Sequence, residues 1–245
     1  MEDKIIAKVF RYDPTVDDAP YYMEYEVPWQ DDPSGFMTGL QVLSYIYEEL
    51  DPIAYDYNCR GGLCGRCSMV INGKPGLACY TPLKPGEHVF EPLESLPMIR
   101  DLIVDRKPYT RRFVEAGVAK KTINPVVKSE DIDYKLYWET LEVLNNCSEC
   151  MCCYDVCPAL ENSTNRDFIG PAAMMQIALR HFDPHDDADR IEQAAHSGLW
   201  DCILCGRCDK VCPSKIPISK TIRKLKIEAE DRGLKPSVVI WNNGQ

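Results

Sequence analysis

Two copies of one cysteine pattern constrain this chain more than any other feature of its sequence. The pattern C-x2-C-x2-C-x3-C-P occurs once at Cys147, Cys150, Cys153, Cys157 and Pro158, and again at Cys202, Cys205, Cys208, Cys212 and Pro213. The chain holds 13 cysteines in all. Its first residues carry charges and lack the apolar run of a secretory signal, so a disulfide framework is disfavoured. Metal binding is the simplest explanation of so many thiols.

The repeated pattern is typical of two-cluster ferredoxins, in which the fourth cysteine of each copy ligates the cluster of the other copy. This crossing predicts two ligand sets for cubane clusters. The first 4Fe-4S set is Cys147, Cys150, Cys153 and Cys212, and the second set is Cys157, Cys202, Cys205 and Cys208. Zinc is the alternative, but zinc sites usually use two separated C-x2-C pairs.

An earlier group of cysteines has the C-x4-C-x2-C spacing of plant-type 2Fe-2S proteins, with a distant fourth member. The predicted ligands are Cys59, Cys64, Cys67 and Cys79. Gly61, Gly62 and Gly65 permit backbone conformations that other residues avoid, and they bring amide N–H groups toward the sulfurs. Asn72-Gly73 predicts a type I′ hairpin that returns the chain to this loop. A four-cysteine zinc knuckle is the alternative.

These assignments use twelve cysteines and leave Cys152, which interrupts the spacing beside Cys153. We expect Cys152 to be a small buried thiol. Histidine adds no ligand set, because the four histidines are scattered and none suggests a Rieske centre. Residues 181–187, with two histidines and three aspartates, are expected to lie on a solvated surface.

Charge divides the chain and argues against nucleic-acid binding. The formal net charge is -10, whereas a general nucleic-acid binder presents cations to phosphates. Residues 1–105 hold 18 acidic and 8 basic residues, so the whole excess of acid lies there. This shift predicts two domains, at 1–105 and 106–245. No apolar run approaches the length of a membrane span.

Periodicity predicts an α+β protein. Residues 5–10 and 23–27 alternate as strands do, residues 40–50 have helical spacing after Thr38 as a cap, and 88–93 is a last strand. Such a mixed sheet around one helix is a β-grasp domain of the plant-type ferredoxin kind. The second domain is expected to be all-α, of the bacterial ferredoxin kind, with helices over 172–182 and 218–229 and with Met174, Met175, Ile177 and Leu179 in its core.

The sequence holds no G-x-G-x-x-G turn after a strand, no Walker loop and no nucleophile motif. Three clusters without a substrate or flavin site indicate an electron carrier that has no catalytic residues of its own.

Longer segments resemble the iron-sulfur subunit of succinate dehydrogenases and fumarate reductases. They are Val9–Pro14, Asp56–Cys67, Ile71–Cys79, Arg100–Asp105 and Phe168–Pro171. The resemblance covers nearly the whole chain. It implies a non-catalytic subunit of a succinate:quinone oxidoreductase or quinol:fumarate reductase, which relays electrons between the FAD of a partner flavoprotein and a membrane quinone or quinol pool. It also implies a peripheral membrane position, on the cytoplasmic face of the cell membrane, beside one or more anchor subunits.

Two features depart from the familiar members of this family, the third-cluster cysteine and the quinone pocket. Those members lack the cysteine that matches Cys205 and carry a 3Fe-4S cluster there; Cys205 favours a second 4Fe-4S cluster, with an unligated Cys205 and a 3Fe-4S cluster as the alternative. The familiar quinone-site Trp is absent from Ala159–Asp167, and Ile203 replaces the familiar His. The quinone-pocket changes imply either a quinone bound mainly by the anchor or electrons that leave through a different partner. Cys205 implies the subfamily with a cysteine-rich, heterodisulfide-reductase-like membrane partner, and a fourth iron there would suit a low-potential quinone such as menaquinone.

Two other functions stay open at this point. One is the iron-sulfur subunit of a soluble fumarate reductase that takes electrons from thiols. The other, more remote, is a zinc-binding interaction module. The physiological direction also stays open, because a chain of clusters conducts toward succinate oxidation in the tricarboxylic acid cycle or toward fumarate reduction in anaerobic respiration.

Overall fold

The computed structural model describes residues 4–30, 35–121, 127–161 and 168–234. The chain forms two compact units. The first unit comprises Met1–Arg112, Asn146–Cys157 and Arg207–Ile216, and the second comprises Phe113–Asn145, Pro158–Gly206 and Pro217–Gln245. Two cysteine-bearing segments therefore group with the N-terminal part. Compactness of this kind does not establish independent folding, so the division into 1–105 and 106–245 stays a prediction.

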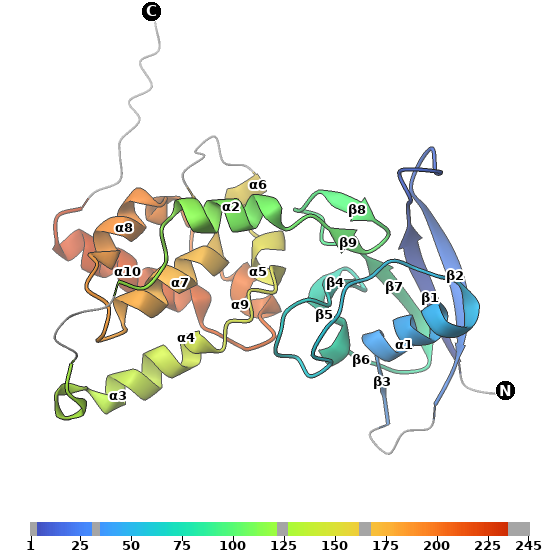
Figure 1. Cartoon of the computed structure of the whole chain (residues 1–245), viewed down its shortest axis with the longest axis horizontal. Helices are drawn as coiled ribbons and strands as arrows, with labels where there is room; N and C mark the ends of the chain where they lie inside the picture. The colour runs from blue at the N-terminus through green and yellow to red at the C-terminus, as the bar shows by residue number, and fades with distance from the viewer. Residues whose placement is uncertain (1–3, 31–34, 122–126, 162–167, 235–245) are drawn as a thin grey trace, which may run out of the picture. The chain divides into compact units, whose positions relative to one another are not determined.

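The first unit is built on a five-stranded sheet in the order β2-β1-β7-β4-β5 (Figure 1). Its strands are β1 (Lys4–Arg11), β2 (Tyr21–Pro28), β4 (Ser68–Ile71), β5 (Lys74–Leu77) and β7 (Gly86–Glu91). β1 and β7 are parallel, and the other pairs are antiparallel. The turn between β4 and β5 places Asn72 and Gly73 at φ of 53° and 70°, as the predicted hairpin requires.

One helix packs on this sheet, as the β-grasp prediction requires (Figure 1). It is α1 (Gly39–Tyr45), which continues as a π-helical turn, Ile46–Leu50. Thr38 caps it: its Oγ1 accepts from the Gln41 amide at 3.2 Å, and the Gln41 side chain accepts from the Thr38 amide at 2.7 Å. Leu40, Val42 and Leu43 are buried with alternate residues of β1 in one apolar core. The α+β fold expected from periodicity is confirmed.

A buried ion pair joins two of the segments that carried the family resemblance. Arg11 Nε donates to Asp101 Oδ1 at 3.1 Å. The aspartate also accepts from the amides of Tyr12, at 2.9 Å, and Ala54, at 2.8 Å. Arg11 also contacts Asp51, so the network holds the strand β1 to the segment that leads into the first cysteine loop. Through these contacts, Arg11 and Asp101, which are far apart in sequence, hold the segment before the first cysteine loop in place.

The second unit is helical around α7 (Pro171–His181). Residues 171–179 of this helix are all buried, including the four apolar residues expected in the core. α7 packs against α8 (Arg190–His196) and α10 (Ile218–Asp231), and Pro171 at the start of α7 follows Gly170 as expected. The segment Ala159–Asp167 contains no Trp, and most of it, residues 162–167, lies outside the described residues.

A buried arginine fixes the turn before α8. The side chains of Arg190 and Asp186 are 1% and 0% exposed, and their Nη2 and Oδ2 atoms lie 2.7 Å apart. Burial opposes the charge of Asp186, but bonds from Arg190 and from the amides of Lys121 and Ala188 outweigh it and lower its pKa to about 2. The expectation of a solvated surface over 181–187 was therefore wrong for Asp186, which is buried against Arg190, and for Asp183, whose side chain is 11% exposed and pairs with Lys120.

Shorter elements complete the described chain. They are β3 (Met37–Thr38), β6 (Pro82–Leu83), β8 (Met98–Arg100), β9 (Ile103–Val104), α2 (Lys107–Glu115), α3 (Tyr134–Leu136), α4 (Val143–Asn145), α5 (Cys152–Asp155), α6 (Pro158–Glu161) and α9 (Arg207–Val211), with 3-10 turns at Ala78–Tyr80, Ser129–Asp131 and Leu199–Asp201 and a π-helical turn at Tyr137–Glu142. Within the described ranges, no helix is both long and apolar enough to cross a bilayer.

Candidate iron-sulfur centres

The β4–β5 hairpin brings the predicted 2Fe-2S ligands together. Cys67 immediately precedes β4 and Cys79 follows β5, and the antiparallel register pairs Ser68 with Leu77 between them. The Ala78 amide donates to Cys67 O at 3.0 Å, and the Cys79 amide donates to Cys67 Sγ at 3.5 Å. The chain thus returns its distant fourth cysteine to the loop, as the hairpin prediction required.

Backbone amides of the loop point at the cysteine sulfurs. Cys59 Sγ accepts from the amides of Gly61, Leu63 and Cys64 at 3.3 to 3.4 Å, and Cys79 Sγ accepts from the Gly62 amide at 3.3 Å. These bonds, with Gly61 first, lower the pKa of Cys59 to about 6. Thiolates are the form that binds iron, and N–H···S bonds offset cluster charge. The loop therefore fits the donor set of a 2Fe-2S cluster.

Three residues of the first cysteine loop have left-handed backbone conformations, and two of them are glycines for which this was expected. Gly62 and Gly65 have φ of 77° and 67°, as expected, but the third such residue is Arg60, at 58°, and not Gly61. The Arg60 guanidinium lies 5.1 Å from the centre of the Tyr57 ring, a cation–π contact. This contact explains how a residue with a side chain is held in the left-handed region.

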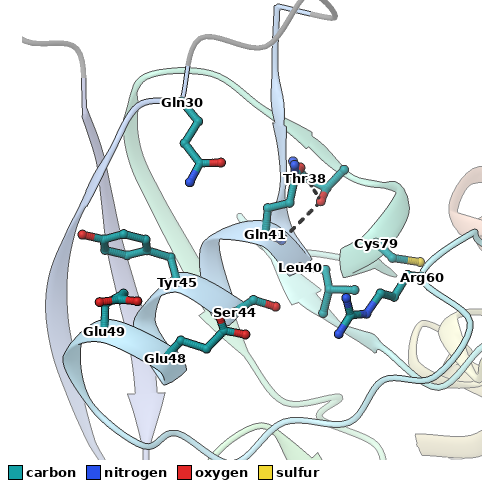
Figure 2. Close-up of a pocket in the computed structure, with 10 residues that line it drawn as sticks. All are labelled: Gln30, Thr38, Leu40, Gln41, Ser44, Tyr45, Glu48, Glu49, Arg60 and Cys79. Atoms are coloured by element: carbon teal, nitrogen blue, oxygen red, sulfur yellow. Dashed lines mark hydrogen bonds between the residues drawn. The ribbon is translucent and has the colours of Figure 1, made fainter.

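A pocket of about 690 Å³ opens beside this loop on the side of α1. Figure 2 shows Arg60 and Cys79 at one end of its lining and Tyr45 and Glu49 at the other. One predicted cluster ligand therefore lies on the wall of a polar pocket.

The four cysteines predicted for the first cubane cluster all belong to the first unit, although Cys212 comes from the second copy of the pattern. Burial raises the pKa of Cys147 to about 11 and that of Cys153 well above its usual value. The ionisation of Cys153 is also disfavoured by Cys150, Cys147, Cys212 and Cys208. Ser214 Oγ donates to Asn146 O at 2.8 Å, so the end of the second copy lies beside the start of the first. Four neighbouring thiols, two of them buried, are the donor set that a 4Fe-4S cluster needs.

Cys152 is buried, as expected, and its surroundings are specific. Its side chain is 0% exposed and belongs to the apolar core of the β-grasp sheet. A hydrogen bond from Cys152 is the largest influence on Cys150, whose pKa falls to about 6. The thirteenth cysteine therefore contacts a predicted ligand, which its position in the sequence did not indicate.

The second copy of the pattern repeats the backbone of the first. Glu149 and Leu204, at the same place in the two copies, have φ of 51° and 55°, and Met151 and Gly206 have φ of 70° and 69°. Cys205 therefore occupies a loop of the same local conformation as Cys150. Its surroundings differ, because Cys205 is exposed.

The predicted ligands of the third cluster are divided between the units. Cys157 and Cys208 belong to the first unit and Cys202 and Cys205 to the second, so their grouping around one cluster stays a prediction. Among the described residues, no three Cys, His, Asp or Glu side chains are grouped so as to hold a single metal ion. Ile203, at the position of the familiar quinone-site His, is 68% exposed.

A lysine that the sequence patterns did not single out supports the second copy. Lys226, on α10, donates from Nζ to Cys202 O at 2.7 Å and to Trp200 O at 3.4 Å. Its ammonium also lies 5.8 Å from the centre of the Trp200 ring. In the sequence, Lys226 follows Ile222 by four residues and precedes Ala229 by three, so helical spacing places it beside the apolar face of α10.

Comparisons with known proteins place this chain among iron-sulfur electron carriers. A sequence model of a 2Fe-2S iron-sulfur cluster binding domain matches residues 6–111, and one of a 4Fe-4S dicluster domain matches residues 143–216. The chain is 33% identical over 253 residues to a fumarate reductase iron-sulfur subunit of Mycobacterium tuberculosis, and the match covers all of both chains. The chain therefore belongs to the family of succinate dehydrogenase and fumarate reductase iron-sulfur subunits, which carry electrons through 2Fe-2S and 4Fe-4S clusters and a third cluster.

Two further relatives define the limits of this assignment. The solved structure titled Mycobacterium smegmatis Sdh1 complex in the apo form has a similar chain, with a TM-score of 0.79, 24% identity and coverage of 97% of this chain and 100% of that one, which shows the fold. One polypeptide of the CoM/CoB fumarate reductase of Methanothermobacter marburgensis is 32% identical over 95% of this chain. The chain covers only 46% of that longer protein.

Proposed function

We propose that this chain relays electrons between the FAD of a flavoprotein subunit and a membrane quinone pool, as part of a succinate:quinone oxidoreductase or quinol:fumarate reductase. The observation that carries the proposal is the packing of the second copy of the pattern against the first. Ser214 Oγ donates to Asn146 O at 2.8 Å and α9 packs against α5, so Cys212 lies beside the first copy, as two adjacent cubane clusters require. The chain supplies the ligands and their surroundings, and the clusters supply the redox chemistry.

The ligand sets follow the sequence prediction. Cys59, Cys64, Cys67 and Cys79 hold the 2Fe-2S cluster; Cys147, Cys150, Cys153 and Cys212 hold the first 4Fe-4S cluster; and Cys157, Cys202, Cys205 and Cys208 hold the second. The matching backbone of the two copies supports Cys205 as a ligand. The alternative at the third site is a 3Fe-4S cluster without Cys205.

The expected partners are a flavoprotein that binds FAD and the dicarboxylate, and a membrane anchor of the heterodisulfide-reductase-like kind. The expected location is peripheral, on the cytoplasmic face of the membrane. The departures at Ala159–Asp167 and Ile203 support a quinone held mainly by the anchor.

Anaerobic purification of the native complex tests this proposal. A flavoprotein, a membrane anchor, and succinate oxidation or fumarate reduction coupled to a quinone are expected together. Replacement of Cys205 by Ser should reduce the quinone-linked activity while a dye that accepts electrons from the flavoprotein still supports succinate oxidation. A complex without flavin, or an activity unaffected by any of the twelve cysteines, would contradict the proposal.

A soluble, thiol-linked fumarate reductase is the second candidate. The similarity to the CoM/CoB fumarate reductase of Methanothermobacter marburgensis favours it. It predicts fumarate reduction by thiols in the soluble fraction, with no activity in membranes. Membrane-bound, quinone-linked activity would exclude it.

A further inference from the structure

The loop that carries the 2Fe-2S ligands touches the loop of the first cubane site backbone to backbone. Gly65 marks this junction, with φ of 67°. A Cβ atom added at Gly65 would lie 2.4 Å from Ser148 O and 2.9 Å from Cys150 Cα. Both neighbours are backbone atoms, which cannot move aside as a flexible side chain can. Only glycine therefore permits this approach.

Arg106 lies at the same junction. Its Nη2 atom is placed to donate to Gly65 O at 3.2 Å, Arg66 O at 3.0 Å and Ser68 Oγ at 2.7 Å. These acceptors lie on both sides of Cys67, so a side chain that follows the β-grasp sheet in sequence holds the end of the 2Fe-2S loop. The two hydrogens of Nη2 are shared among these three acceptors.

Arg106 also lies near the loop of the first cubane site. Arg106 Nη2 lies 3.2 Å from Gly65 O, and a Cβ added at Gly65 would lie 2.9 Å from Cys150 Cα, so the guanidinium lies beside both cysteine loops. Within the described residues, no carboxylate lies at ion-pair distance from Arg106; the nearby Asp56 is paired with Arg66 at 2.8 Å. A half-buried cation without a carboxylate partner needs another source of negative charge. Clusters held by four thiolates are anionic and provide it.

We propose that Arg106 and Gly65 form the junction between the 2Fe-2S and first 4Fe-4S sites, where Arg106 raises the potentials of both clusters and Gly65 allows them to approach. This inference rests on the proposed ligands of these two sites. Reduction adds negative charge to a cluster, and a nearby fixed cation stabilises the reduced form. Arg106 is thus a positioning residue that also sets potentials.

Arg106→Gln tests the charge, with Arg66→Gln as the matched control. The midpoint potentials of both clusters in the purified complex, measured by EPR-monitored titration, are expected to fall in Arg106→Gln. The shift in Arg66→Gln is expected to be smaller, because that side chain is 49% exposed and water screens its charge. Equal shifts in the two variants, or unchanged potentials in Arg106→Gln with both clusters present, would overturn the proposal.

Gly65→Ala tests the approach, with Gly73→Ala as its control. Gly73 has nearly the same φ, at 70°, but an added Cβ would meet nothing within 4 Å. Magnetic coupling between the two reduced clusters, read from the spin relaxation of the 2Fe-2S signal, is expected to weaken in Gly65→Ala alone. Unchanged coupling in Gly65→Ala would overturn this part of the proposal.

Arg106→Lys keeps the test available if the Gln variant does not assemble. Lysine retains the charge, so potentials close to those of the unmodified complex are expected, and a fall in both would contradict the charge argument. Iron and acid-labile sulfide analysis of the unmodified complex separates the two levels of inference. Absence of the clusters there would reject the proposed ligands, whereas intact clusters with unaffected potentials reject only the junction.

Discussion

The two copies of the cysteine pattern share a backbone and differ in what surrounds it. Both copies place their second and fourth loop residues after the first cysteine in left-handed conformation, with matching φ values. The first copy is packed into the core of the β-grasp sheet through Cys150 and Cys152. In the second copy Cys205 is exposed, and Cys202 and Cys208 are half-buried.

This difference separates what spacing determines from what packing determines. Cysteine spacing sets the path of a loop around a cluster, so it recurs in both copies. Burial, hydrogen bonds and nearby charges set the potential of a cluster and the cost of losing a ligand. Equivalent cysteines in the two copies should therefore respond differently to substitution.

The largest contrast is expected between Cys150→Ala and Cys205→Ala. Cys150→Ala should remove the first cubane cluster, with a loss of about four irons, and should also destabilise the sheet core that it contacts. Cys205→Ala should remove about one iron and leave a 3Fe-4S cluster. Iron analysis and EPR of the oxidised complexes measure both, and equal iron loss in the two variants would break the comparison.

The support of the second unit is tested by Arg190→Met. This change leaves Asp186 buried and unpaired, which is expected to cost about 3–5 kcal/mol in the free energy of unfolding of that unit. Arg232→Met is the control, because Arg232 and Asp189 are each 41% exposed and water screens such a pair, so little stability should be lost. In urea titrations followed by circular dichroism, Arg190→Met should unfold at a lower urea concentration than Arg232→Met. Similar losses of unfolding free energy in both variants would show that the buried Arg190–Asp186 pair stabilises the protein no more than the exposed pair does.

Lys226→Met should affect the second copy alone. Loss of the ammonium removes a hydrogen bond from a charged donor to Cys202 O, at an expected cost of about 1.5–3 kcal/mol. The potential of the third cluster is expected to shift, and that of the first cubane cluster is not. Lys220→Met, at an exposed position on the same helix, is the matched control. A shift of the first cubane potential would be evidence against separate support of the two copies.

The smallest effect is expected from Gly206→Ala. Its φ of 69° costs a residue with a side chain about 1–2 kcal/mol. Met151 occupies the equivalent position with φ of 70°, but its buried side chain offsets that cost. Thermal unfolding should show a loss for Gly206→Ala, and an unchanged melting temperature would mean that the second loop relaxes to another conformation.

Local patterns predicted much of this molecule. Asn72-Gly73 predicted the hairpin and Thr38 predicted the cap, because both depend on residues within a few positions of one another. The ligand sets rest on spacing in the same way. Contacts made across the fold were missed: Arg106 with Gly65, Lys226 with Cys202, and Arg190 with Ala119. The partners are far apart in sequence, so neither a periodic pattern nor a short motif predicts these contacts.

One conformational detail of the first cysteine loop was predicted incorrectly. Glycine was expected at every left-handed position of the first cysteine loop, yet Arg60 occupies one of them. A ring contact with Tyr57 stabilises it there, and such a contact depends on where two side chains meet. The same reasoning applies to Asp186, whose charge suggested solvent although the fold buries it against Arg190.

The iron content and the EPR spectrum of the oxidised, anaerobically purified complex test the central claim most directly. If both copies of the pattern bind cubane clusters through four cysteines, the chain holds about ten irons and the oxidised complex shows no 3Fe-4S signal. About nine irons, with a 3Fe-4S signal before any reductant is added, would show that Cys205 is not a ligand and would contradict the equivalence of the two copies.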